Sequence, residues 1–255
     1  DTEIEQIAFS GYVAFHVSTS FLGVECVMRN YTLDEIQPGD GFLINDPYSA
    51  GAIHQGDVAV VMPYFYDGEI VGWGHIDEHV LDVGGSAVSG FAPEARDCFS
   101  EALRFPGVRA IRFGELDREW RRFIEKNVRV PDPVLNDIRS MIAAHHTGQD
   151  RLSRLIDEYG LDGFRQYCAI NKDLSEQMVR GKLSRIPDGE YVSHDWVEYD
   201  GHGVAQLLPL SCRFVVAGDE ATFAFEGHEQ IDAFVNATPA VMLGQSMTTL
   251  LCQLL

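Results

Sequence analysis

The chain contains few basic residues: 19 Lys and Arg stand against 39 Asp and Glu among 255 residues, which gives a formal net charge of −20. Proteins bind nucleic acids and anionic membranes mainly through Lys and Arg, which displace counterions from phosphate groups. The composition therefore argues against both kinds of partner. The hydrophobic fraction of 45% is ordinary for a folded protein, so the acidity does not indicate disorder.

Cysteine is also scarce, and long apolar runs are missing. The five cysteines lie far apart, so the sequence predicts neither a CxxC metal-binding motif nor a disulfide framework. No stretch reaches the about 18 apolar residues that a membrane-spanning helix needs. The acidic first residues do not resemble a signal peptide. We therefore expect a cytosolic protein with reduced thiols.

The motifs of several common enzyme classes are absent from the sequence. Gly181-Lys182 is followed by Leu183 and lacks the upstream glycine of a phosphate-binding P-loop. No GxGxxG motif follows a predicted strand, and no GxSxG motif is present. The sequence thus contains neither a recognisable nucleotide site of these kinds nor the nucleophile motif of a serine hydrolase.

The chain changes character twice along its length, which predicts an α+β fold in three segments. Residues 1–115 are rich in strands, loops and turns and contain the candidate site described below. Residues 116–186 show helical periodicity. Residues 187–255 are predicted as antiparallel strands that lead into a final helix.

Strands are expected where β-branched and aromatic residues cluster between turn residues. In the first segment these are residues 9–17 and 58–66, and Asp67-Gly68 predicts a hairpin that joins 58–65 to 70–73. In the last segment three further strands are predicted, at residues 190–199, 207–216 and 220–225.

Helices are expected where apolar residues recur at three- and four-residue spacing. The pattern predicts one helix around residues 135–146, a second that ends at Gly160 and a third over 162–185. A last helix begins at Pro239, is strongly apolar and has no C-terminal cap. Such a helix needs a packing partner, so we expect the chain to be part of a longer polypeptide.

The densest group of polar residues lies between Asn45 and Gly85 and indicates a metal site. His54 and Asp57 enter a predicted strand, and His79 follows 25 residues after His54, from the neighbouring strand of the hairpin. Together they can place two imidazoles and one carboxylate around a divalent ion, a ligand set that suits Zn, Mn or Fe(II). The lack of nearby thiolates disfavours a purely structural zinc site.

Spacing alone leaves other interpretations open. The same window contains His75, Asp77 and Glu78, so the histidines and acids can cluster by chance. Non-haem iron oxygenases have one residue between the His and the acid, whereas this chain has two, so that family is not matched. Adjacent His145 and His146 have the wrong spacing to share a metal from one helix, and structural roles are expected for them.

A series of motifs occurs in a fixed order along the chain. They are Gly39–Val58, Pro63–Gly68, His79–Gly85, the helical stretch 133–160, Ile186–Tyr191, Asp200-Gly201 and Asn236–Ala240. In this order they resemble the hydantoinase B / 5-oxoprolinase / acetone carboxylase alpha-subunit family. The similarity covers nearly the whole chain, and members of that family are considerably longer.

The resemblance implies that His54, Asp57 and His79 are metal ligands, with manganese as in the acetone carboxylase branch or zinc as in a relative that acts on aromatic ketones. It also implies a partner subunit of the hydantoinase A type with an actin-like ATPase fold. ATP and Mg are expected on that partner, where they would phosphorylate the substrate in transit. Residues expected to orient the imidazoles of the ligands are Asn45, Asp46 and Asp82.

Two departures from the ring-opening members favour one branch of the family. Many ring-opening members have Gly-Gly-Thr-His and His-His-Ala-Asp at these two places. This chain has Gly51-Ala-Ile-His54 and His79-Val-Leu-Asp82 instead. Its His54-Gln55 pair is closer to the carboxylases. We therefore predict a metal-binding catalytic subunit that carboxylates a ketone with bicarbonate through a phosphorylated enol. The alternatives are ATP-dependent ring opening of a cyclic amide such as a hydantoin, 5-oxoproline or lactam, and an inactive structural subunit of such a complex.

Overall fold

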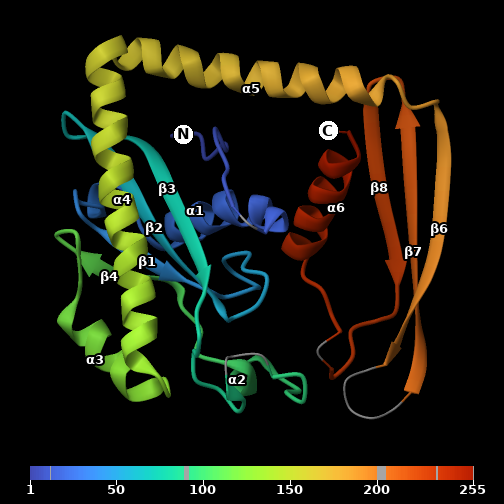
Figure 1. Ribbon diagram of the computed structural model, residues 1–255, viewed down its shortest axis with the longest axis horizontal. Coiled ribbons are helices and arrows are strands. Elements are labelled where there is room, and N and C mark those ends of the chain that lie inside the picture. Colours follow the sequence, from blue (N-terminus) through green and yellow to red (C-terminus); the bar gives the residue numbers. More distant parts are fainter. Residues whose placement is uncertain (12, 89–91, 200–204, 234, 255) are drawn as a thin grey trace.

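The computed structural model describes residues 1–255 apart from 12, 89–91, 200–204, 234 and 255. Its helices and two antiparallel sheets confirm the predicted α+β class (Figure 1). The described elements are η1 (Ala14–Ser18), α1 (Thr19–Asn30), η2 (Leu33–Glu35), β1 (Gly41–Ile44), β2 (Asp57–Tyr66), β3 (Glu69–His79), α2 (Cys98–Glu101), β4 (Pro106–Arg112), β5 (Glu115–Leu116), α3 (Arg118–Asn127), α4 (Pro131–Tyr159), α5 (Leu161–Leu183), β6 (Gly189–Tyr199), β7 (Ala205–Ala217), β8 (Glu220–Gly227) and α6 (Pro239–Leu254).

The first sheet has the strand order β3-β2-β1-β4-β5 and lies between α1 and α4 (Figure 1). Side chains along a strand alternate between the two faces of the sheet. On β2, Val58 and Val60 therefore join the core under α4, whereas Ala59 and Val61 join the core under α1. Both faces of β2 are thus buried, which gives this strand a fixed position.

The predicted hairpin is confirmed and consists of β2 and β3. Asp67 and Gly68 form its two-residue turn, with φ angles of 50° and 84° as a type I′ turn requires. The antiparallel register then pairs Asp57 with His79 at the far end of the hairpin. A register shift of one residue between Tyr64 and Phe65 is needed for this pairing, because the turn alone would place Asp57 opposite Glu78.

The helical region differs from the prediction in one respect, because residues 131–159 form a single helix, α4. Gly148 lies where the pattern predicts a break. A Cβ atom on Gly148 would lie 2.6 Å from the hydroxyl oxygen of Tyr64, so the strand approaches the helix closely at this point. Packing against the sheet thus compensates for the low intrinsic helix propensity of glycine.

The predicted strand at residues 9–17 is wrong. Residues 14–18 form the 3-10 helix η1, and none of the described residues between Phe9 and Val13 lies in a strand. Phe9 and Phe15 instead line a cavity beside the first sheet. The aromatic and β-branched composition of this segment therefore reflects contacts with the cavity and not ladder pairing.

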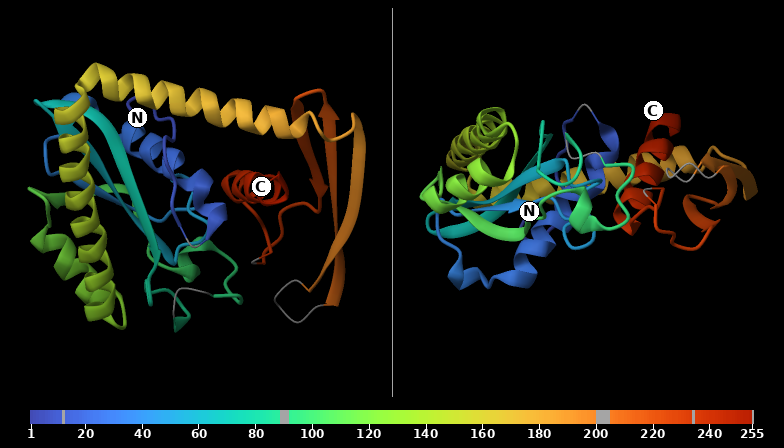
Figure 2. Two further views of the ribbon diagram at one scale, coloured as in Figure 1. Left: turned by 45° about the horizontal axis from the view of Figure 1, so that its top comes forward. Right: turned by 90° about the horizontal axis from the view of Figure 1, so that it is seen from below.

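Helix α5 leads from α4 to the second sheet, which has the order β6-β7-β8 (Figures 1 and 2). Helix α6 then packs against η1. The hydroxyl of Ser18 donates a hydrogen bond to the carbonyl of Ala240 (3.0 Å), and Gly244 packs so closely against the carbonyl oxygen of Phe15 that a side chain would not fit there. The last helix thus fixes the position of η1, which carries His16.

His145 and His146 make structural contacts. His145 is 1% exposed, and its Nε2 and Nδ1 atoms lie 3.0 Å from the Val60 carbonyl oxygen and the Tyr64 hydroxyl, respectively. Nε2 of His146 lies 2.9 Å from the carbonyl oxygen of Gly114. Burial lowers the pKa of His145 to about 4, so this imidazole is neutral in the folded protein.

We expect His145 to make folding stability depend on pH. Between pH 6.5 and about pH 4 the unfolded chain binds a proton at this residue and the folded chain does not, so the free energy of unfolding falls as the pH is lowered through this range. The loss attributable to His145 is ~3 kcal/mol. Denaturant unfolding at several pH values should show a shallower pH dependence in His145→Gln, and equal slopes in the two proteins would contradict this role.

Candidate metal centre

The structure brings the three predicted ligands together at one end of the β2–β3 hairpin. Asp57 begins β2, His79 ends β3, and His54 lies in the loop just before β2. Oδ1 of Asp57 lies 3.3 Å from Nε2 of His54 and 3.1 Å from Nδ1 of His79. The candidate ligand atoms of all three residues lie within 4.8 Å of one another.

Burial differs among the three side chains. Asp57 is 5% exposed, whereas His54 and His79 are 31% and 52% exposed. The carboxylate therefore forms the base of the cluster and the imidazoles lie nearer to solvent. Burial lowers the pKa of His54 despite the opposing charge of Asp57, which favours the neutral imidazole that metal binding requires.

Backbone contacts fix the loop that carries His54. The Asp57 N–H donates to the His54 carbonyl (3.0 Å), and the Val80 N–H donates to the Gly56 carbonyl (3.0 Å). At Gly56 there is no space for a side chain, because a Cβ would lie 2.7 Å from Cε1 of His54 and 3.0 Å from Cε1 of His79. The two imidazole rings therefore pack against the backbone of Gly56.

These residues fit a divalent metal ion. Two imidazoles and one carboxylate suit Zn, Mn or Fe(II). Moreover, Oδ2 of Asp57 is buried and has no hydrogen-bond partner among the described residues. Such an atom is costly to bury, and a cation bound by this carboxylate would remove part of that cost.

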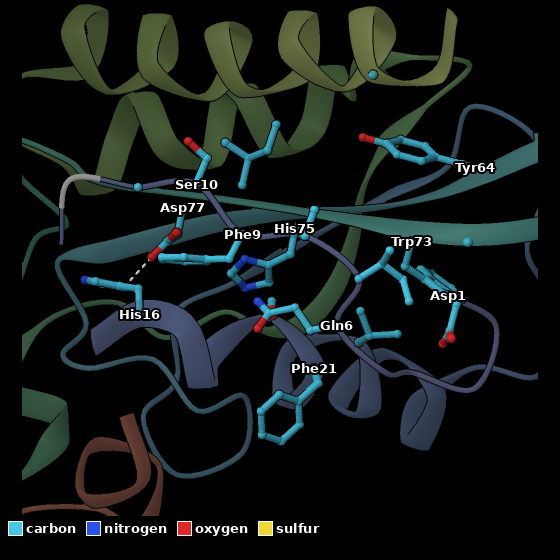
Figure 3. A pocket seen from close by; sticks show the side chains of 18 of the residues that line it. Asp1, Gln6, Phe9, Ser10, His16, Phe21, Tyr64, Trp73, His75 and Asp77 are labelled. Carbon is cyan, nitrogen blue, oxygen red and sulfur yellow. Dashed lines mark hydrogen bonds and ion pairs between the residues drawn. The ribbon is translucent and has the colours of Figure 1, made fainter. Parts of the chain in front are cut away.

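His16 and Asp77 extend the cluster, and neither was predicted as part of it from the sequence. Nε2 of His16 lies 3.8 Å from Oδ2 of Asp57, and Nδ1 of His16 forms an ion pair with the Asp77 carboxylate (Figure 3). Burial alone would lower the pKa of His16, but the hydrogen bond and charge of Asp77 raise it. For Asp77, the contacts with His16 and His75 outweigh burial and lower the pKa.

The position of Asp77 could have been inferred from the sequence. It precedes His79 by two residues, and residues two apart share a face of a sheet once the second hairpin strand is extended from residue 73 to His79. No spacing in the sequence connected His16 with these residues. It reaches the cluster from η1, in the segment that was predicted as a strand.

The three residues predicted to orient the ligands make contacts of different kinds. Asn45 binds backbone groups, including the Gln55 carbonyl between His54 and Gly56. Asp46 accepts hydrogen bonds from the Tyr48 N–H and the Ser49 hydroxyl. Asp82 is buried and forms an ion pair with Arg129 (2.9 Å). Asn45 therefore acts on the loop that carries His54, and an influence of Asp46 and Asp82 on the imidazoles stays a prediction.

A cavity of about 1120 Å³ adjoins the cluster. His54, Asp57 and His79 line it together with His16, His75 and Asp77. Most of the remaining wall is apolar and comes from the N-terminal segment, α1, β3 and α4. Figure 3 shows Phe9, His75 and Asp77 directed into this space. The candidate metal centre thus opens on a cavity large enough for a small organic molecule.

We expect Gly56→Ala to weaken metal binding without unfolding the protein. The added methyl group must displace His54 and His79 by several tenths of an ångström, because it would lie within 3.0 Å of both rings. Metal affinity should fall about 10–100-fold, as for other changes that misorient ligands. Isothermal titration with Zn²⁺ and Mn²⁺ measures this loss. Gly181→Ala, a site with open space on α5, is the matched control, and equal affinity in the two variants would contradict the packing argument.

Known structures share this fold over almost the whole chain. The crystal structure of ATP-dependent caprolactamase from Pseudomonas jessenii superposes with a TM-score of 0.89 and 28% identity, covering 97% of this chain and 42% of that one. A nucleotide-free structure of acetone carboxylase has the same TM-score over 98% of this chain and 35% of its own, but at 18% identity it supports the fold alone. The fold is therefore that of subunits from large ATP-dependent enzymes.

The chain belongs to the hydantoinase B/oxoprolinase family, whose pattern it matches over residues 1–255. It is 30% identical to caprolactamase subunit beta of Pseudomonas jessenii over 225 residues, which are 88% of this chain and 38% of that protein. It is 26% identical to the acetophenone carboxylase delta subunit of Aromatoleum aromaticum, over 74% of this chain and 27% of that protein. The chain thus spans less than half the length of these relatives. None of the helices in its described part combines the length and apolar character that a membrane crossing requires.

Proposed function

We propose that this chain forms the metal-binding catalytic part of an ATP-dependent enzyme that opens a cyclic amide. The cluster of His54, Asp57 and His79 at the wall of a largely apolar cavity carries this proposal. The relationship to a caprolactamase subunit, at 30% identity, supports the cyclic amide as the substrate class. A divalent ion bound here would supply Lewis acidity toward a substrate oxygen.

The protein residues have separate tasks in this proposal. Asp57 offsets part of the charge of the ion, while the neutral imidazoles of His54 and His79 complete the ligand set. The apolar wall of the cavity excludes water around the substrate and thereby strengthens electrostatic interactions at the reacting group. The ion pair of His16 and Asp77 presents a polar group on the same wall.

ATP is assigned to a partner subunit of the hydantoinase A type. The sequence contains no P-loop, and the relatives named above are themselves subunits of larger enzymes. A separate ATPase would account for both observations.

Carboxylation of a ketone with bicarbonate is the second candidate. The segment Gly51-Ala-Ile-His54-Gln55 resembles the carboxylases more than the ring-opening members, and the acetophenone carboxylase delta subunit is a relative at 26% identity. An inactive structural subunit fits less well, because the three candidate ligands are all present and close together.

ATP turnover separates the two reactions. The full-length protein would be purified with its ATPase partner and assayed with caprolactam in the absence of bicarbonate, and with acetone or acetophenone in its presence. We expect stimulation of ATP hydrolysis and appearance of the amino acid only with the lactam. Stimulation that requires both a ketone and bicarbonate would establish the second candidate. No stimulation by either substrate, with metal bound, would support the inactive subunit.

A further inference from the structure

The wall of the cavity is apolar on the side that adjoins the metal cluster. The side chains that form it there come from the N-terminal segment, η1 and helix α1, and they include Phe9, Phe15 and Phe21. Trp73 lines the cavity farther along β3, six residues before His79. Figure 3 shows the rings of Phe9 and Phe21 on either side of His75. A molecule whose reacting carbonyl lies at the cluster would therefore place its remaining atoms against aromatic and aliphatic groups.

The charged side chains close to the cluster are largely paired with one another. Asp77 lies two residues and Glu78 one residue before His79, and both line the cavity. The charge of Asp77 is offset by His16, with which it pairs. Glu78 pairs with Val58, whose side chain joins the core under α4, so Glu78 points to that face and away from His79. A second carboxylate brought in by a substrate would thus meet apolar surface, and no Lys or Arg among the described lining residues lies at this end to pair with it.

The basic residue that lines the cavity, Arg151, lies at its other end. The Gln149 side chain hydrogen-bonds both the N–H and the C=O of Phe65 (2.8 Å each), which fixes this part of α4 beside the turn end of the hairpin. There Tyr64 pairs with Gly72, seven residues before His79. At about 3.3 Å per residue, the two ends are about 23 Å apart. A small substrate cannot reach the cluster and Arg151 at once.

From this distribution we propose that the cavity accepts an uncharged substrate with an apolar ring or chain and rejects its carboxylated analogue. The inference rests on the proposed function for the position of the reacting carbonyl. It narrows the cyclic amide of the proposed function to one class of substrate, a simple uncharged lactam and not a lactam carboxylate such as 5-oxoproline.

Binding to the complex without ATP tests the inference separately from catalysis. Calorimetry would compare two matched pairs that differ only by a carboxylate, 2-pyrrolidinone with 5-oxoproline and acetophenone with 4-acetylbenzoate. We expect the neutral member of at least one pair to bind about tenfold or more tightly than its acid. Equal or tighter binding of the acids, or no binding by any of the four, would overturn the inference.

Two substitutions at Phe9 sharpen the test. Phe9→Ala should weaken the neutral ligands about tenfold through lost apolar contact. Phe9→Arg should instead improve binding of the acids, since it adds a cation to the wall beside the cluster. Phe113 is 93% exposed and lies outside the cavity, so Phe113→Ala and Phe113→Arg are the matched controls. Unchanged selectivity in both Phe9 variants would contradict the proposed wall.

The outcomes also separate this inference from the proposed function. If the neutral lactam binds selectively but is not hydrolysed with ATP, the cavity is as inferred and the proposed reaction is wrong. If 5-oxoproline is hydrolysed as well as 2-pyrrolidinone, the proposed reaction stands and the inferred selectivity is wrong.

Discussion

Asp57→Asn is expected to abolish stoichiometric binding of a divalent metal. Oδ1 of Asp57 lies within 3.3 Å of a nitrogen of both His54 and His79, so this carboxylate is the centre of the proposed ligand set. Its other oxygen is buried without a hydrogen-bond partner among the described residues. Asparagine keeps the shape but removes the charge that balances the ion. Changes around metal ligands cost about 10–100-fold in affinity, and loss of a ligand itself should exceed about 100-fold.

Elemental analysis of the purified protein and titration with Zn²⁺ and Mn²⁺ measure this effect. Asp67→Asn is a matched control, because Asp67 lies in the exposed hairpin turn and asparagine tolerates its positive φ angle. The unfolding midpoint of the metal-free variant should stay close to that of the metal-free wild type. Full metal content in Asp57→Asn, or in His54→Ala, would rule out the assignment of these ligands.

The sequence predicted that His54, Asp57 and His79 lie together because their proximity depends largely on local features. The Asp67-Gly68 turn joins β2 to β3 and brings Asp57 close to His79. Their direct pairing also needs the one-residue register shift between Tyr64 and Phe65, which the sequence did not predict. The position of His54 beside Asp57 follows from their short separation in the sequence. Family resemblance added the identity of the three residues, and the match over the whole chain confirms that resemblance.

The features that the sequence did not reveal depend on contacts between distant segments. His16 reaches Asp57 from η1, and η1 packs against α6 through the close approach of Gly244 to Phe15, some 230 residues apart along the chain. Similarly, α4 continues through Gly148 because Tyr64 of β2 packs against that glycine. Local propensity and periodicity contain no information about either contact.

Among the substitutions proposed for this protein, Asn45→Asp is expected to lower the free energy of unfolding most, by about 3 kcal/mol or more. Asn45 is fully buried, and its Nδ2 donates to the carbonyls of Gln55 (2.7 Å) and Leu103 (2.9 Å). Its Oδ1 accepts a hydrogen bond from the N–H of Phe105 (2.6 Å). Aspartate has the same shape but no donors, so it would place a buried charge against two carbonyl oxygens that lose their partners.

The same substitution should also weaken metal binding, since Gln55 lies between His54 and Gly56 in the loop that Asn45 fixes. Denaturant unfolding of the metal-free protein measures the loss of stability, and metal titration of the folded variant measures the second effect. Asn136→Asp on the exposed face of α4 makes the same chemical change without buried partners. A change in unfolding free energy equal to that of this control would show that the loop is held by other contacts. Loss of stability with unchanged metal affinity would instead show that Asn45 supports the core of the sheet and not the geometry of the ligands.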